Sequence, residues 1–442
     1  MRAPVLSRHD SVGLRGLLAE LRRSDTGRAA GLGVAVIAVN VLALVFTIVF
    51  ARLLGASGYG SLAVLLSAFI ILMVPGSALQ IAAAREVSHD LAVGSPSAGA
   101  GVRRWLGRLA IGTVLAAIVA IPLRSLIGAL INVDELWAAA AVPVTAMLWM
   151  IVCVERGVLQ GLQRYRTVGF SLVGEALSRI VFALLLVAVG LDVTGAFLGS
   201  ALSLAAVALV LLWPLGRELG HVEDDPEKDI RLRELLVGAW VPVIGLTLLL
   251  GLQELHIIIV KHEASDDAAG SYAVAAVAAK AIVWIAVGLG MYLLPEAARR
   301  GKIGLDARPI LMRTLGLIAV AAVPMVLIYA VAGKPLLGAV FGDDLTGASG
   351  ALPWLGLAMS LLACVYLSVQ LLLAMGRATF IWVLGVAIVV EVVALIVIGA
   401  DLTAVAIALF AVQVLCAGAV LALALRQSTP DVEAATTPFS VR

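Results

Sequence analysis

Charged residues are scarce in this 442-residue chain: they make up 14% of it, whereas soluble domains carry about a quarter. Aromatic residues contribute only 5%. The three cysteines, Cys153, Cys364 and Cys416, lie inside apolar runs and form neither a CxxC pair nor a metal-binding set. What remains is 62% hydrophobic, with a mean hydropathy of +1.09. No soluble core could bury so much apolar surface, and the sequence therefore predicts a membrane protein.

Apolar runs long enough to cross a bilayer recur along the whole chain. A transmembrane helix needs about 20 such residues, and the alternating pattern of a membrane β-barrel is absent. The sequence therefore predicts an all-α polytopic membrane protein with about twelve transmembrane helices. Their expected ranges are 29–51, 59–84, 104–128, 136–158, 166–189, 193–215, 234–260, 271–297, 308–332, 350–374, 379–399 and 402–425.

A polar interruption divides these helices into two sets of six. The expected organisation is a cytoplasmic N-terminal arm at 1–28, an N-lobe at 29–215, a cytoplasmic linker at 216–233, a C-lobe at 234–426 and a disordered cytoplasmic tail at 427–442. Within the arm, Leu14, Leu17, Leu18 and Leu21 share one helical face. This pattern predicts a short amphipathic helix on the membrane surface.

Arginine and lysine residues are concentrated in the loops of one side of the predicted bundle. The loops of the opposite side have only Arg52, Arg124, Lys261 and Lys334. Under the positive-inside rule, the basic side faces the cytoplasm. We therefore expect both termini to be cytoplasmic.

Two pairs of similar segments indicate an internal repeat. GSLAV at 60–64 resembles GSYAV at 270–274, and the two begin 210 residues apart. VAVGLDVT at 187–194 resembles IVIGADLT at 396–403, with 209 residues between their starts. Each pair occupies the equivalent place in its set of six helices, which favours a repeat over a chance match. Because six is even, the two halves run in the same direction, and the predicted pseudo-two-fold axis lies along the membrane normal, as in many transporters.

Lys280, in the eighth predicted helix, is the most prominent charge within a span, where charged side chains are candidates for function. No acidic residue lies three or four positions away from it along the chain. Two interpretations are open. Lys280 either pairs with a carboxylate on another helix, or faces a cavity between the lobes and contacts the anionic head of a substrate.

Other intramembrane charges have alternatives of the same kind. Glu175 and Arg179 have the i, i+4 spacing of a helical ion pair, which is either structural or part of a cavity or gate. Glu391 either carries a proton or pairs with a basic residue. Glu254 and His256 lie in the outer part of the seventh helix, where His256 either titrates near neutral pH or is a structural polar side chain.

Catalytic constellations are missing from the sequence. The predicted extracytoplasmic loops are short, and no Gly-Lys phosphate-binding loop is present. We therefore expect neither an enzyme nor a cofactor, and the net charge of +2 gives no indication of a nucleic-acid partner.

Four segments resemble bacterial polysaccharide flippases, the O-antigen-type (Wzx-like) members of the MOP superfamily of MATE-like exporters. They are FARLLGASGYGSLAV at 50–64, RGVLQGLQRYRTVGFSLVGEALSR at 156–179, VKHEASDDAAGSYAVAAVAAK at 260–280 and LLPEAARR at 293–300. The resemblance implies two six-helix lobes around a central cavity, framed by the first, second, seventh and eighth helices.

The resemblance also implies a function. It indicates alternating access and transport of an undecaprenyl-pyrophosphate-linked oligosaccharide across the bacterial cytoplasmic membrane, in concert with glycosyltransferases and a polysaccharide polymerase. The candidate cavity residues are Arg52, Glu175, Arg179 and Lys280, and the candidates for ion coupling are Glu254, His256 and Glu391. A MATE-like antiporter of small molecules or cations is the alternative.

Overall fold

The structure is a computed structural model that describes residues 25–92, 100–219, 240–302 and 305–426. Within these ranges the chain is helical and contains no strand. The predicted amphipathic helix around 14–21, most of the 216–233 linker and the 427–442 tail lie outside them.

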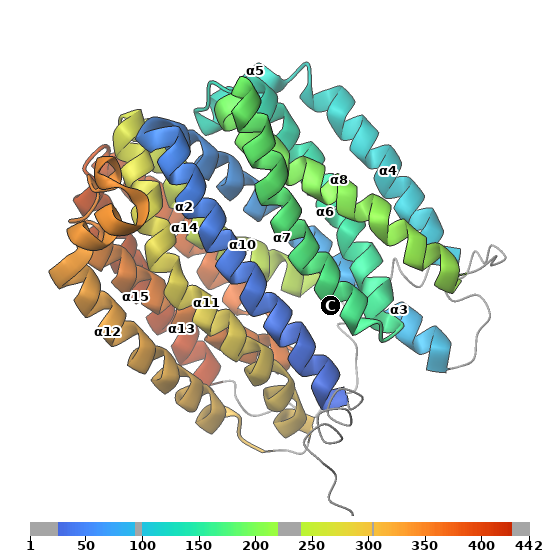
Figure 1. Ribbon diagram of the computed structural model, residues 1–442. Coiled ribbons are helices and arrows are strands. Elements are labelled where there is room, and N and C mark those ends of the chain that lie inside the picture. Colours follow the sequence, from blue (N-terminus) through green and yellow to red (C-terminus); the bar gives the residue numbers. More distant parts are fainter. Residues whose placement is uncertain (1–24, 93–99, 220–239, 303–304, 427–442) are drawn as a thin grey trace, which may run out of the picture.

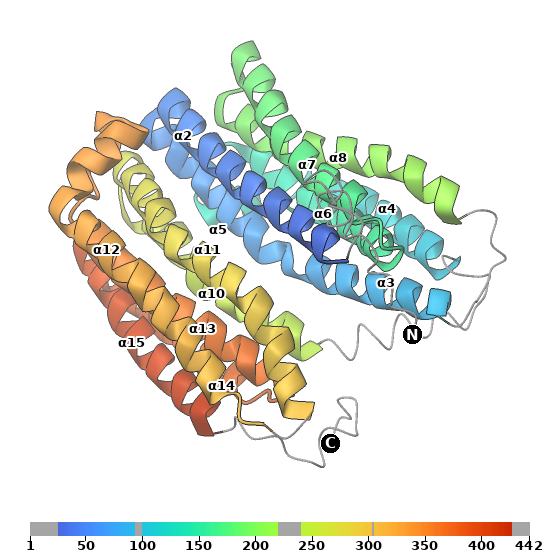
Figure 2. The ribbon, with the colours of Figure 1, turned by 60° about the horizontal axis from the view of Figure 1, so that its bottom comes forward.

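The helices form two groups in chain order (Figures 1 and 2). The N-lobe contains α2 (Asp25–Leu72), α3 (Val74–Ala92), α4 (Ala100–Ala120), α5 (Arg124–Ile131), α6 (Leu136–Gly161), α7 (Tyr165–Leu186), the π-helical turn η1 (Val187–Leu191) and α8 (Asp192–Leu219). The C-lobe contains α10 (Trp240–Glu263), α11 (Asp266–Lys302), α12 (Arg308–Phe341), the 3-10 turn η2 (Asp343–Leu345), α13 (Leu352–Ala374), α14 (Phe380–Ile398) and α15 (Leu402–Arg426).

The described part of the chain has nine helical segments long and apolar enough to cross a membrane, or ten when the bent pair α4–α5 counts as one span. Two of these segments, Gly33–Ala92 and Tyr165–Arg217, have 60 and 53 residues. At about 20 residues per crossing, each is long enough for two. Counting them so gives twelve spans, and the predicted all-α polytopic fold is confirmed.

Gly55 lies at a kink within α2 that separates the first two crossings. Its backbone has φ 68° and ψ −174°, a conformation that glycine adopts readily because it lacks a Cβ. The chain therefore reverses direction there, as the predicted boundary between 51 and 59 requires.

The third predicted span, 104–128, is not one straight helix. The structure breaks it between α4 and α5, whose axes differ by 83°. Pro122 lies in the break, and proline has no backbone N–H to continue the helical hydrogen bonds. The short α5 then ends at Asn132, which has a left-handed backbone with φ 53°.

The two copies of the repeated segment lie against each other across the lobe interface. A Cβ added to Gly60 on α2 would lie 3.0 Å from the backbone nitrogen of Gly270 on α11. A Cβ added to Gly270 would lie 1.8 Å from the carbonyl oxygen of Ala56. Only glycine permits backbones to approach so closely, and the shared GS dipeptide thus marks the point where the two lobes cross.

The lobes meet mainly through α2 on one side and α10 and α11 on the other. In Figure 1, α2 runs between α7 and α11, and Figure 2 shows α2, α11 and α12 close together at one end of the bundle. This end contains Gly55, Asn132, the α10–α11 turn and η2, and is called the outer end below, because its loops are those predicted to be extracytoplasmic.

Candidate functional site: buried charges at and beside the lobe interface

Lys280 on α11 forms a buried ion pair with Glu254 on α10. The distance from Lys280 Nζ to Glu254 Oε2 is 2.7 Å, and the side chains are 7% and 1% exposed. A lone ammonium is unfavourable inside a membrane-spanning bundle, and the carboxylate neutralises it.

Two further side chains complete this group. Ser67 on α2 donates its hydroxyl to Glu254 Oε2 at 2.7 Å, and Gln253 Nε2 donates to Glu254 Oε1 at 2.9 Å. Both carboxylate oxygens of Glu254 are thus satisfied. Ser67 belongs to the N-lobe and the other three residues to the C-lobe, so this interlobe charge cluster (Ser67, Gln253, Glu254 and Lys280) joins the two lobes.

Of the two interpretations of Lys280, the structure therefore shows the pair with a carboxylate on another helix, and a contact with the anionic head of a substrate stays a prediction. The partner lies 26 residues earlier in the chain, on a neighbouring helix, which spacing within a single helix does not reveal. Ser67 and Gln253 were not predicted, because serine and glutamine in an apolar helix give no signal of their partners.

His256 and Tyr272 form a second buried contact in the C-lobe. The Tyr272 hydroxyl lies 3.1 Å from His256 Nδ1, and the two rings meet edge to face with centroids 5.6 Å apart. His256 Nε2 is buried and has no hydrogen-bond partner among the described residues. The histidine is fully buried at the interior of the bundle and not at its surface.

Glu391 on α14 is 1% exposed, and neither of its carboxylate oxygens has a hydrogen-bond partner within the described ranges. No ion pair of Glu391 with a basic residue is found there either. Gln413 on α15 is also buried without a partner in this part of the chain.

In the N-lobe, Glu175 pairs with Arg156 and not with Arg179. Arg156 on α6 is fully buried. Its Nη2 lies 2.8 Å from Glu175 Oε2, and its Nε donates to Ser171 Oγ at 2.9 Å. The expected i, i+4 pair is corrected, because a more deeply buried guanidinium on the adjacent helix takes the carboxylate.

Arg179 lies over the ring of Phe46 on α2, with its guanidinium carbon 4.6 Å from the ring centroid. Its Nε is buried and has no hydrogen-bond partner in the described residues. Glu175 interacts with it electrostatically, but no carboxylate in the described ranges lies within salt-bridge distance of Arg179. Arg179 is thus a cation of the N-lobe whose hydrogen-bonding capacity is not used up by the protein.

Arg52 lies at the outer end, where it reaches across to the C-lobe. Its Nη2 donates to Ala339 O at 2.6 Å and its Nε to Val340 O at 3.1 Å, both in the last turn of α12. The structure thus separates the four candidate cavity residues: Arg52 is at the outer end, Lys280 in the interlobe cluster, and Glu175 and Arg179 inside the N-lobe.

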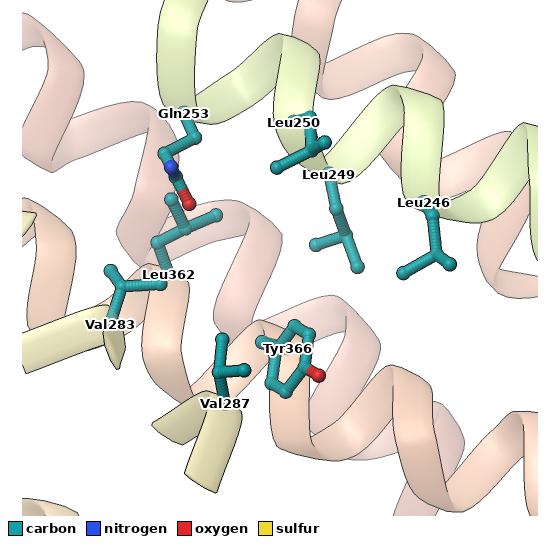
Figure 3. A pocket seen from close by; sticks show the side chains of 8 residues that line it. All are labelled: Leu246, Leu249, Leu250, Gln253, Val283, Val287, Leu362 and Tyr366. Carbon is teal, nitrogen blue, oxygen red and sulfur yellow. The ribbon is translucent and has the colours of Figure 1, made fainter. Parts of the chain in front are cut away.

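A small cavity of about 50 Å³ borders the interlobe charge cluster on its C-lobe side (Figure 3). Its walls are Leu246, Leu249, Leu250, Gln253, Val283, Val287, Leu362 and Tyr366. Sites for small ligands usually have volumes of about 300–1,000 Å³. This cavity is therefore too small and too apolar for a sugar chain, although it borders the glutamine that donates to Glu254.

No group of three or more His, Cys, Asp or Glu side chains suited to a metal ion occurs in the described ranges. Of the charges described above, Lys280 and Glu254 form one pair, Arg156 and Glu175 form another, and Glu391 has no ion pair in the described ranges. Such an arrangement is suited to binding, orientation and proton transfer within a membrane-spanning bundle.

Solved structures of membrane transporters share this fold. An inward-facing multidrug resistance MATE family transporter of the MOP superfamily has a TM-score of 0.73 and 12% identity, with 88% of this chain and 94% of that chain covered. The lipid II flippase MurJ, in an inward closed conformation, has a TM-score of 0.68 and 11% identity, with 89% and 87% covered. A MOP superfamily transporter from Pyrococcus furiosus has a TM-score of 0.60 and 15% identity, with 92% and 97% covered.

The sequence itself assigns the family. The profile described as "Polysaccharide biosynthesis protein" matches residues 29–299, more than half of the chain. The chain belongs to this family, and the predicted resemblance is confirmed. No curated protein sequence matches it significantly.

Proposed function

We propose that the protein is a flippase that moves an undecaprenyl-pyrophosphate-linked glycan from the cytoplasmic to the outer leaflet by alternating access. The family match supports the substrate class, and the fold supports a transport mechanism. The proposal places the protein in the bacterial cytoplasmic membrane with both termini in the cytoplasm, where glycosyltransferases supply its substrate and a polymerase receives it.

The single observation that supports an anionic head group on the substrate is the guanidinium of Arg179, which has no carboxylate at contact distance among the described residues. A diphosphate needs cationic donors, and arginine matches phosphate oxygens with a planar, multidentate set of N–H groups. Lys280 is already neutralised by Glu254, and Arg156 by Glu175. Arg179 keeps a guanidinium that is held in place by Phe46 without a carboxylate at contact distance.

Proteoliposomes containing a fluorescent polyprenyl-pyrophosphate oligosaccharide test this role. Arg179→Ala should lower the flipping rate roughly tenfold or more, because one charged hydrogen bond contributes about 1.5–3 kcal/mol. Arg179→Lys should retain part of the rate. Arg217→Ala is the matched control, since Arg217 also lies over an aromatic ring, that of Trp213, but near the end of α8. An Arg179→Ala protein that flips the lipid at the unaltered rate contradicts the proposal.

A MATE-like antiporter of small molecules or cations is the second candidate. The buried carboxyl of Glu391 favours it, since a cationic drug is recognised by negative charge. The same vesicles distinguish the two: efflux of a cationic dye down an imposed ion gradient, without glycan-lipid flipping, would support the antiporter.

Glu254, His256 and Glu391 are our candidates for coupling transport to an ion gradient. Glu391 is the leading one, because a buried carboxyl without a hydrogen-bond partner in the described residues is well placed to carry a proton. Glu254 is held by three donors, which suits it better to a conformational role.

A further inference from the structure

The outer end of the interface uses one type of contact twice. In each case a side chain of the N-lobe donates to a backbone carbonyl in the last turn of a C-lobe helix. Arg52 donates to Ala339 O and Val340 O at the end of α12, and Asn132 Nδ2 donates to Lys261 O at 2.5 Å near the end of α10.

The carbonyls at the end of a helix have no partner within that helix and carry the negative end of its dipole. A cationic or amide donor from the opposite lobe satisfies them while the lobes are together. Water can replace either donor when the lobes separate, because Arg52 is exposed and Asn132 lies at the same end of the molecule. Such contacts are specific in geometry but reversible.

The repeat shows why Arg52 makes this contact and its counterpart does not. Arg52 ends the first crossing of the N-lobe, and Lys261 lies at the corresponding end of α10 in the C-lobe. The Lys261 ammonium is bound within its own lobe by Asp266, five residues later in the first turn of α11. Five residues after Arg52 the chain has Ser57, which is exposed and uncharged. Arg52 is therefore not retained by its own hairpin.

We propose that Arg52 and Asn132 form a latch that holds the outer ends of the two lobes together, and that Asp266 keeps Lys261 out of this role. Arg52 thus positions the lobes and does not bind substrate, which revises its place among the candidate cavity residues. The inference rests on the alternating-access transport proposed above, but it concerns the outer closure alone.

Distances between spin labels at the outer end test the latch in full-length protein in lipid nanodiscs without substrate. The labels are placed on Leu130→Cys in α5 and Asp344→Cys in η2, two exposed positions in different lobes. The native Cys153, Cys364 and Cys416, which are all unpaired, are first replaced by alanine.

Arg52→Ala should shift the distance distribution to longer distances. Ser57→Asp should produce the same shift although Arg52 is still present, because the new carboxylate lies at the spacing by which Asp266 binds Lys261. Ser57→Asn is the matched control of similar size and should leave the distribution unchanged. Adding Ser57→Asp to Arg52→Ala should cause no further shift, since both act on one contact.

Either of two results would overturn the latch: an Arg52→Ala protein with the distances of the unaltered protein, or identical distributions for Ser57→Asp and Ser57→Asn. The substitutions at Ser57 alter only an exposed side chain, which keeps the test decisive if Arg52→Ala is poorly folded. If the substitutions open the outer end as expected but the unaltered protein moves no glycan lipid, the result contradicts the proposed function and leaves the latch standing.

Discussion

Individual charged residues in this chain are easier to find than to pair. Hydropathy alone identified Glu175, Arg179, Glu254, Lys280 and Glu391 as charges within spans. The partners of Glu175, Glu254 and Lys280 come from neighbouring helices. Arg156 and Glu175 are 19 residues apart in the chain, and Glu254 and Lys280 are 26 apart. Spacing along one helix reports only on its own face, so the pairs depend on helix packing, which one sequence does not specify.

Breaking the Lys280–Glu254 pair should destabilise the protein more than removing it. Lys280→Met leaves Glu254 buried with Ser67 and Gln253 as its remaining partners, and loss of one member of a buried pair typically lowers the free energy of unfolding by about 3–5 kcal/mol. The double variant Lys280→Met/Glu254→Gln leaves no uncompensated charge and should recover most of this loss. Thermal unfolding in detergent measures both.

An exposed ion pair provides the control for that experiment. Arg299 contacts Glu296 at 2.6 Å, but the arginine side chain is 62% exposed. Solvent screens exposed pairs of this kind, so Arg299→Met should change the unfolding temperature little. A double variant at 280 and 254 that is as unstable as Lys280→Met alone would show that the cluster is not held together by this pair.

At the scale of helices, the sequence specifies most of the fold, because about 20 apolar residues per crossing and the polar loops between them are visible directly. The break at Pro122 was not predicted, although proline allows it, since many proline-containing helices continue with only a kink. The meeting of GSLAV and GSYAV was also not predicted. The repeat identified equivalent positions, but equivalence does not say that the two copies touch.

Gly270→Ala should disturb the crossing of α2 and α11. The new Cβ would lie 1.8 Å from the carbonyl oxygen of Ala56, which is backbone and cannot rotate away. We expect a lower unfolding temperature and a longer distance between the outer-end labels. Gly418→Ala on α15 is the control, because nothing lies within 4 Å of its added Cβ. Alanine also has a higher helix propensity than glycine. Equal behaviour of the two variants would show that the close crossing does not exist.

The whole molecule combines a family-level assignment with an orientation that only the loop charges predict. The fold of two lobes does not specify the direction of insertion. Both lobes run the same way through the membrane, so that inverting the molecule inverts both lobes together. The outer end carries helix-end contacts such as Arg52 with α12, whereas the opposite end carries most of the basic loops. Which end faces the cytoplasm therefore decides whether the latch closes the exit or the entry of the transport path.

Cysteine accessibility in intact bacteria determines this orientation. In a background without Cys153, Cys364 and Cys416, single cysteines replace Asp134 in the α5–α6 loop, Asp344 in η2 and Asp306 before α12, all of them exposed. The positive-inside rule retains loops rich in arginine and lysine in the cytoplasm, and Asp306 lies between Arg300 and Arg308. A membrane-impermeant maleimide should therefore label Asp134→Cys and Asp344→Cys in intact cells, and Asp306→Cys only after permeabilisation.

The opposite pattern would reverse the orientation and make the Arg52 latch a cytoplasmic one. Positions 134 and 344 lie in different lobes and are expected on the same side of the membrane. Different labelling of the two would contradict the count of crossings between them, and with it the parallel repeat.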